Sequence, residues 1–154
     1  MLEETRDGWR VSIEGFELLE LGLSGQVSLI AWSNDGKGRT ATIALLGEFR
    51  LRDGSGQDYQ LSAEEDWANL VPLFSLRAQH LTMVTAGRDG SLHVEFEGGL
   101  RLDVDPHPAY ESWQLWAPDD IWLVSPPGGG DPLEAAQSAT FVYGPEQSTD
   151  PPER

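Results

Sequence analysis

The sequence contains no cysteine among its 154 residues. Disulfide bonds, thiolate metal sites and cysteine nucleophiles are therefore excluded, and we expect a protein of the reducing cytoplasm. Long apolar runs are also missing, and none approaches the roughly 20 residues that a membrane-spanning helix requires. The N-terminal stretch Met-Leu-Glu-Glu-Thr-Arg-Asp is acidic and precedes no apolar segment, so no signal peptide is expected.

Basic residues are scarce. Ten Lys and Arg stand against 26 Asp and Glu, which gives a formal net charge of −16. Such a surface repels phosphate backbones and anionic lipids, so we expect neither nucleic acid nor a membrane as a partner. A basic protein would be attracted, and its association rate would depend on salt. The simpler interpretation is that the acidity only keeps the protein soluble.

Recognisable catalytic and ligand-binding motifs are absent as well. The chain has no Gly-x-x-x-x-Gly-Lys-Ser/Thr loop, no Gly-x-Ser-x-Gly elbow, no His-Glu-x-x-His pair and no EF-hand loop. The glycines at 128–130 precede Asp131, whose charge would repel phosphate, and we interpret them as a flexible turn where regular structure ends. We therefore predict no cofactor and no catalytic residue, and the balance is against an enzyme.

What the sequence does contain is the alternating hydrophobicity of β-strands. The clearest signal lies in residues 87–104, where the pair Asp89-Gly90 precedes a strand with Leu92, Val94 and Phe96 on one face. Residues 27–32 are apolar on both faces, which predicts a central strand that is covered on both sides. Further strands are expected within 9–23, 39–46, 47–52, 57–61, 81–86, 114–116 and 121–124.

One helix is predicted at residues 62–71. Ser62 suits the N-cap, and Glu65 three residues later completes a capping box. Pro72 cannot donate a backbone hydrogen bond, so the helix should end or kink there. We expect Trp67 to anchor the helix on the sheet, as part of an apolar stripe with helical spacing: Ala63, Trp67, Leu70, Val71 and Phe74.

Length and patterning together predict a single α+β domain, mostly antiparallel β, with two meander-like halves and one short helix between them. The segment Gly47-Glu-Phe-Arg-Leu-Arg52 resembles Gly98-Gly-Leu-Arg-Leu-Asp103, which is consistent with an internal duplication. We expect residues 1–8 to be frayed and residues 9–130 to form the domain. Residues 131–154 should be a Pro- and Gly-rich acidic tail with a short strand at 139–143.

Several short motifs of the second half fit one known pattern. They are Asp89-Gly-Ser-Leu92, Gly99-Leu-Arg-Leu102, Pro106 and Pro108, Tyr110-Glu-Ser-Trp113, and Pro127-Gly-Gly129. In this combination the chain resembles an uncharacterised family of small bacterial proteins, a domain of unknown function. The resemblance covers residues 80–130 well and the first half loosely, and the chain continues about 24 residues past the glycines. It implies a shared fold and brings no established activity or site residues.

The best candidate surface is the corner that carries Tyr110, Glu111 and Trp113. Two aromatic rings and a carboxylate at a sheet edge could hold a partner, because Tyr and Trp give large contact areas at low entropic cost. The structural alternative is that these residues close the end of the core, with Trp113 buried and Glu111 accepting hydrogen bonds from turn amides. Trp116 and Trp122 lie close by in the sequence and could extend a hydrophobic patch or pocket.

Asp103, Asp105 and His107 alternate and would share one face of an extended strand, where they could hold a divalent cation. Pro106 and Pro108 would distort that geometry, so we predict a solvated strand end and no metal. His93 lies on the polar face of its strand and needs no special role.

Two functions are compatible with these features. The first is a non-enzymatic, acidic protein-binding domain, in its sharpest form an immunity or antitoxin-like partner of a basic toxin, because such proteins often present an acidic surface to a basic active site. The alternative is a small-molecule-binding protein or an unrecognised enzyme with a pocket near Tyr110, Trp113 and Trp116. The sequence does not determine the oligomeric state.

Overall fold

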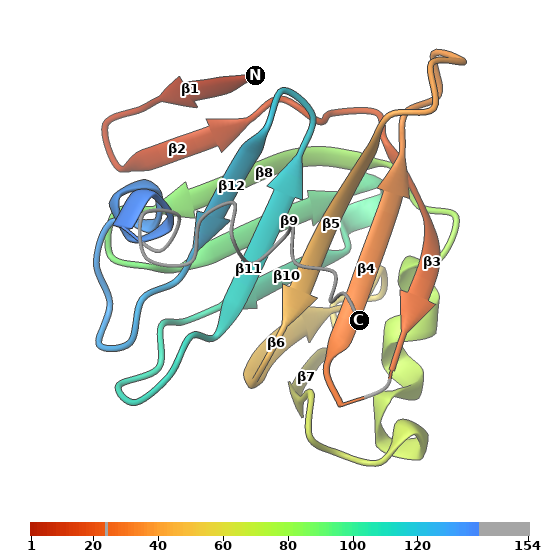
Figure 1. Cartoon of the computed structure of the whole chain (residues 1–154). Coiled ribbons are helices and arrows are strands. Elements are labelled where there is room, and N and C mark those ends of the chain that lie inside the picture. Colours follow the sequence, from red (N-terminus) through yellow and green to blue (C-terminus); the bar gives the residue numbers. More distant parts are fainter. Residues whose placement is uncertain (24, 139–154) are drawn as a thin grey trace, which may run out of the picture.

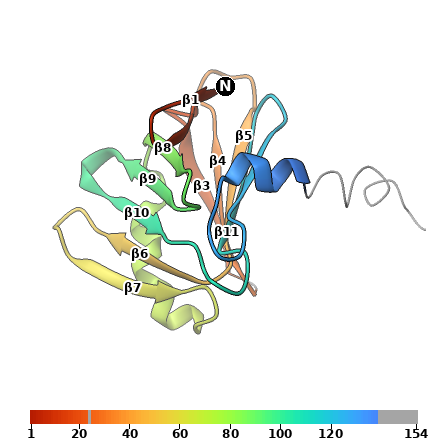
Figure 2. The same ribbon diagram turned by 90° about the vertical axis from the view of Figure 1, so that its left-hand side faces the viewer.

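The computed structural model describes residues 1–23 and 25–138, which form two antiparallel sheets packed face to face (Figures 1 and 2). The predicted class, mostly antiparallel β with a small helical part, is confirmed. The seven-stranded sheet has the order β1-β2-β8-β9-β10-β6-β7, and the five-stranded sheet has the order β12-β11-β5-β4-β3. The strands are β1 (Leu2–Glu4), β2 (Gly8–Val11), β3 (Glu17–Gly22), β4 (Val27–Trp32), β5 (Thr40–Leu45), β6 (Glu48–Arg52), β7 (Asp58–Ser62), β8 (Leu81–Gly87), β9 (Leu92–Phe96), β10 (Arg101–Val104), β11 (Trp113–Ala117) and β12 (Ile121–Val124).

Each sheet contains strands from both halves of the chain. In the seven-stranded sheet, β6 of the first half pairs with β10 of the second, with Leu51 opposite Leu102. In the five-stranded sheet, β5 pairs with β11, with Leu45 opposite Trp113. The similar segments at 47–52 and 98–103 thus lie largely on neighbouring antiparallel strands. The two halves interleave and do not form separate layers.

The core lies between the two sheets and follows from the period-two alternation of the strands. On β6, Phe49 and Leu51 point inward while Glu48, Arg50 and Arg52 point to solvent. On β4 the residues that face the other sheet are buried, and those on the outer face are half-buried. The strand is therefore central, as predicted, but only one of its faces is fully covered.

The predicted hairpin at residues 87–104 is present. Strands β8 and β9 pair with Ala86 opposite Leu92, and the short 3-10 turn η2 (Glu97–Gly99) connects β9 to β10. Gly90 has a φ of +96°, which favours glycine, and an added Cβ would lie 3.2 Å from Pro106. The turn therefore fits closely under the loop that precedes β11.

Both chain ends differ from expectation. Residues 1–8 are not frayed, because β1 pairs with β2 at the edge of the seven-stranded sheet. Regular structure does not end at the glycines 128–130, because residues 132–138 are helical. Asp131 caps this helix, since its Oδ1 accepts the backbone N–H of Leu133 at 2.9 Å. The strand expected at 139–143 lies outside the described residues.

The helix between the halves is also displaced and of another type. It is the 3-10 helix η1 (Trp67–Leu76), which includes Pro72. Ser62 is the last residue of β7, and its hydroxyl accepts the N–H of Glu64 in a tight turn instead of capping a helix. No helix within the described residues combines the length and hydropathy needed to cross a membrane.

Candidate functional site

Trp113 is a core residue. Its side chain is fully buried, and the indole N–H donates to the carbonyl oxygen of Gly90 at 2.8 Å. The hydrogen bond ties β11 to the β8–β9 turn across the sandwich. A ligand or partner therefore has no access to this ring.

Tyr110 and Glu111 are held by local contacts. Tyr110 is 37% exposed and stacks on His107, with ring centroids 3.7 Å apart. The Tyr110 ring also packs against Gly47, where an added Cβ would lie 2.9 Å from the hydroxyl. The structural alternative predicts that Glu111 accepts hydrogen bonds from turn amides, whereas in the structure its carboxylate accepts the side-chain amide N–H of Gln114 at 2.7 Å.

Trp116 and Trp122 form a cross-strand pair between β11 and β12, with stacked rings 6.5 Å apart. Trp116 is 41% exposed, whereas Trp113 on the same strand is buried. Because side chains three positions apart on a strand point to opposite faces, Trp113 and Trp116 cannot line one pocket. The predicted pocket between Tyr110, Trp113 and Trp116 is not formed by these side chains.

The residues of the considered metal site are separated by their partners. Asp103 binds His93 at 2.6 Å and Arg101 at 3.0 Å, while Asp105 binds Arg50 at 2.7 Å. His107 uses Nδ1 to accept the N–H of Ala109. Within the described part of the chain, no group of three acidic or histidine side chains could hold a metal ion.

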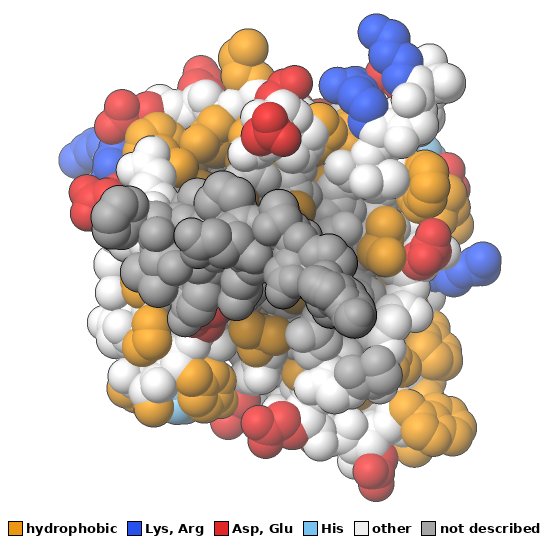
Figure 3. All heavy atoms as spheres, viewed as in Figure 1, with side chains coloured by type: hydrophobic (Ala, Val, Ile, Leu, Met, Phe, Trp, Pro, Cys, Tyr) orange, Lys and Arg blue, Asp and Glu red, His pale blue; other side chains and the backbone are white. Residues whose placement is uncertain are grey.

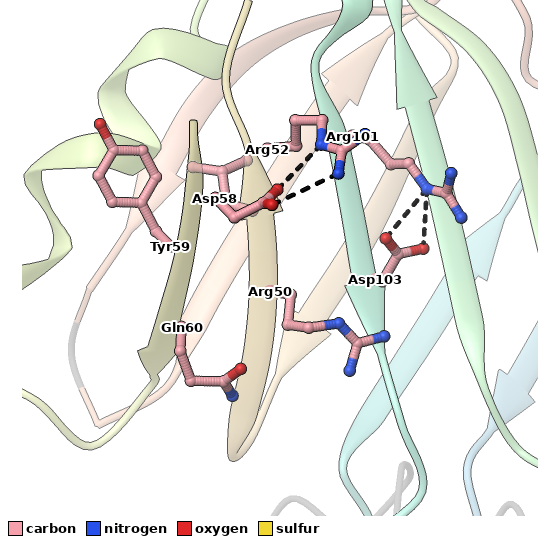
Figure 4. Close-up of a pocket in the computed structure, with 8 residues that line it drawn as sticks. Arg50, Arg52, Asp58, Tyr59, Gln60, Arg101 and Asp103 are labelled. Carbon is pink, nitrogen blue, oxygen red and sulfur yellow. Dashed lines mark hydrogen bonds and ion pairs between the residues drawn. The ribbon is translucent and has the colours of Figure 1, made fainter. Parts of the chain in front are cut away.

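The outer face of the seven-stranded sheet carries rows of paired charges. A groove of about 430 Å³ lies over β6, β7 and β10. Figure 4 shows the residues that line it, with Arg52 bound to Asp58 and Arg101 bound to Asp103. The guanidinium of Arg52 holds the pKa of the Asp58 carboxyl below its usual range. Arg50 also lines the groove, and its partner Asp105 lies outside the lining, so three arginines and two aspartates line the groove.

The largest exposed aromatic side chains outside these regions lie on η1. Trp67 is 66% exposed, Phe74 48% and Val71 47%. For Val71 and Phe74 the cause is the period of the 3-10 helix, in which side chains three positions apart lie on one face. One such face is buried through Leu70, Leu73 and Leu76, which leaves Val71 and Phe74 on the solvent side. Trp67 stands three positions before Leu70, so the period does not account for its exposure at the first position of the helix. The prediction that Trp67 anchors the helix on the sheet is wrong.

Acidic side chains stand next to these apolar ones. Glu64, Glu65 and Asp66 directly precede η1 and are exposed, and within the described residues no ion pair neutralises them. We call the six residues Glu64, Glu65, Asp66, Trp67, Val71 and Phe74 the η1 surface. In Figure 3, hydrophobic side chains gather at the lower right, in the region of η1, with acidic side chains below them. The η1 surface thus combines exposed apolar area with unpaired negative charge.

The sequence analysis predicts an apolar stripe that includes Trp67, Val71 and Phe74, but it assigns these three side chains to the core. Leucines at 70, 73 and 76 repeat every three residues, which matches the period of a 3-10 helix better than the α-helical period of 3.6. This signal predicts that Val71 and Phe74 face solvent, but it would also place Trp67 on the buried face.

Comparison with known proteins identifies a family for the chain but indicates no activity. No curated protein and no solved structure matches the chain. The family described as a family of unknown function (DUF6188) matches residues 5–131, including the first half, which the motifs had covered only loosely. The match ends at the residue that caps the C-terminal helix. The chain therefore belongs to this family of unknown function.

Proposed function

We propose that this protein is a non-enzymatic protein-binding domain that takes a basic partner through the η1 surface. The observation that carries the proposal is the exposure of Trp67, Val71 and Phe74 beside three unpaired carboxylates. Exposed apolar patches on soluble domains are typical of interaction sites. Aromatic anchors give much of the binding energy at such sites.

The charges around the patch favour a partner whose surface is positively charged. Glu64, Glu65 and Asp66 would be brought close to the partner's surface, where a basic side chain stabilises them and an acidic one is repelled. The net charge of −16 also accelerates the encounter with a basic protein at low salt. A second copy of this chain is a poor partner, because the same carboxylates would face one another.

In its sharper form, the proposal is an immunity or antitoxin-like domain that neutralises a basic toxin in a bacterial cytoplasm. A small acidic domain that blocks a basic active site needs shape, charge and an apolar anchor, and the η1 surface offers the last two. The alternative of a small-molecule pocket near Tyr110, Trp113 and Trp116 gains no support, since Trp113 faces the core and Trp116 the outer face of the other sheet.

The experiment is a pull-down from the native cell lysate with the tagged protein, washed first at low and then at high salt. We expect a basic protein that high salt releases. Trp67→Ser together with Phe74→Ser should abolish its capture. Trp116→Ser is the matched control, because it removes an exposed tryptophan from the outer face of the other sheet and should leave capture unchanged.

The outcomes separate the surfaces. Loss of capture with Trp116→Ser alone would place binding on the β11–β12 face and reject the η1 surface. Capture that resists high salt, or an acidic partner, would reject the electrostatic part of the proposal. Thermal unfolding of each variant shows that it is folded before its binding is compared.

A further inference from the structure

The free edge of β7 presents backbone groups that have no partner. The hydrogen bonds from Asp53 N–H to Gln57 and from Ala63 N–H to Gly47 fix the register of the β6–β7 hairpin. In an antiparallel pair, every second residue directs its backbone groups to the neighbouring strand and the others direct theirs away. Asp58, Gln60 and Ser62 therefore direct theirs away from β6.

Most of these outward groups are unpaired. Within the described residues, only the Ser62 carbonyl has a backbone partner, the N–H of Glu65 at 3.1 Å. The N–H and C=O groups of Asp58 and Gln60 and the N–H of Ser62 stay open. By contrast, the edge of β3 is partly occupied, because Leu18 exchanges hydrogen bonds with Ala78 and Gln79.

The sequence of β7 does little to protect its edge. Exposed edge strands are commonly blocked by proline, lysine or a bulge. The segment Asp-Tyr-Gln-Leu-Ser contains neither proline nor lysine, and its register with β6 runs without a shift. The side chain of Asp58 is bound to Arg52 on the outer face of the sheet and does not cover the edge.

This edge lies beside the η1 surface. Trp67 follows Ser62 by five residues, and β7 and η1 are in contact. Figures 1 and 2 both show η1 next to β7 at one end of the sandwich. A row of open hydrogen-bonding groups, an apolar patch and a cluster of carboxylates thus adjoin one another.

We infer that the basic partner binds through an extended segment that adds to β7 as an eighth strand of the seven-stranded sheet. The inference rests on the proposed function and specifies how that partner is held. Main-chain hydrogen bonds to Asp58, Gln60 and Ser62 supply the alignment, as in other complexes formed by strand addition. The segment's apolar side chains contact Trp67, Val71 and Phe74. Its basic side chains contact Glu64, Glu65 and Asp66.

The probe is a synthetic eight-residue peptide of alternating lysine and valine, with a glutamate–valine peptide as the charge control. Hydrogen exchange measured by NMR reports directly on the protection of the backbone amides at the edge of β7. We expect the amides of Asp58, Gln60 and Ser62 to exchange about tenfold more slowly with the lysine peptide bound and to be unaffected by the glutamate peptide.

Two variants at one position test the backbone contact. Gln60→Pro removes the outward N–H without breaking a bond to β6, and proline is tolerated at such edge positions. Gln60→Ala removes the same side chain and keeps the N–H. We expect Gln60→Pro to bind the lysine peptide about tenfold more weakly than Gln60→Ala, since at least one hydrogen bond is lost. A lysine peptide whose backbone is N-methylated on alternate residues lacks the N–H donors for strand addition and should also bind weakly. This test needs no change to the protein.

Failure of this inference differs from failure of the proposed function. If Gln60→Pro binds like Gln60→Ala and Trp67→Ser weakens binding, strand addition is wrong while the η1 surface stands. If the N-methylated peptide binds like the parent, strand addition is likewise wrong. If the lysine peptide does not bind, or the glutamate peptide binds equally well, the basic extended segment is rejected. Sedimentation that shows a dimer dissociated by Gln60→Pro would make a second copy the occupant and overturn the inference.

Discussion

At the scale of single residues, Trp113 links parts of the two sheets and presents no surface for binding. Its ring fills the space between the sheets, and its N–H holds the carbonyl of Gly90. A buried polar group without its partner costs more than a hydrogen bond contributes. The residue that first suggested a binding site is therefore a structural one.

Trp113→Phe should lower the free energy of unfolding by about 2 kcal/mol, because it leaves a small cavity and an unpaired carbonyl oxygen at Gly90. Chemical denaturation at neutral pH measures the change. Trp116→Phe makes the same substitution at an exposed ring and should change stability by less than about 0.5 kcal/mol. Equal effects of the two variants would contradict the assignment of Trp113 to the core.

Asp89 should make stability sensitive to acid. The hydroxyl and the backbone N–H of Ser91 hold the pKa of the Asp89 carboxyl below its usual value. A lowered pKa contributes stability that is present above the pKa of the unfolded chain and is lost as the pH falls through the folded value. Wild type should therefore lose more stability than Asp89→Asn between pH 5 and the folded pKa. Parallel losses in denaturation series at several pH values would contradict this.

At the scale of elements, local signals led to correct predictions for the hairpin strands and to wrong ones for the helices. The Asp-Gly turn and the alternation after it predict the hairpin correctly, because both act between neighbours in the chain. The first helix was placed at residues 62–71, since Ser62 and Glu65 match a capping box, but the turn after β7 uses Ser62 instead. The second helix was missed although Asp131, Pro132 and Glu134 form a local start signal. Contacts from distant parts of the chain also stabilise that start.

Those contacts converge on Asp131. Its carboxylate caps the helix at residues 132–138 and also accepts the indole N–H of Trp9 at 3.0 Å and a guanidinium N–H of Arg88 at 3.3 Å. Asp131→Ala should therefore lower the free energy of unfolding by about 1–2 kcal/mol. Glu134→Ala, an exposed position in the same helix, should stay within about 0.5 kcal/mol. Denaturation curves that coincide would show that the cap contributes nothing.

The candidate site was only partly predictable for a related reason. Alternation along β11 does predict that Trp113 and Trp116 face opposite ways. Which of the two faces is buried depends on the packing of the second sheet, which the local pattern does not contain. The same holds for β7, whose position at a sheet edge follows from the pairing of β6 with β10, about a third of the chain away.

At the scale of the whole molecule, self-repulsion should be measurable. Most of the ion pairs lie at exposed positions, where such pairs contribute little. The 26 acidic residues exceed the ten basic ones, so a net charge of −16 remains whatever the pairing. Raising NaCl from about 10 to 300 mM screens this repulsion, since the Debye length shortens from about 30 Å to less than 8 Å. The melting temperature should rise over this range, and a fall in calorimetry would contradict the prediction.

The strand order also governs how the chain is made. Gly8 of β2 pairs with Gly87 of β8, and the roughly 80 residues between them take about 4–16 s to synthesise on a ribosome. During that interval β1 and β2 can pair only with each other, because β8, the next strand of their sheet, has not been made. The loop between β2 and β8 must close, at an entropic cost, before these strands can form stabilising contacts. Folding should therefore take milliseconds to seconds even when the whole sequence is available. The seven-stranded sheet cannot grow beyond this pair at its N-terminal edge until more than half of the protein has left the ribosome.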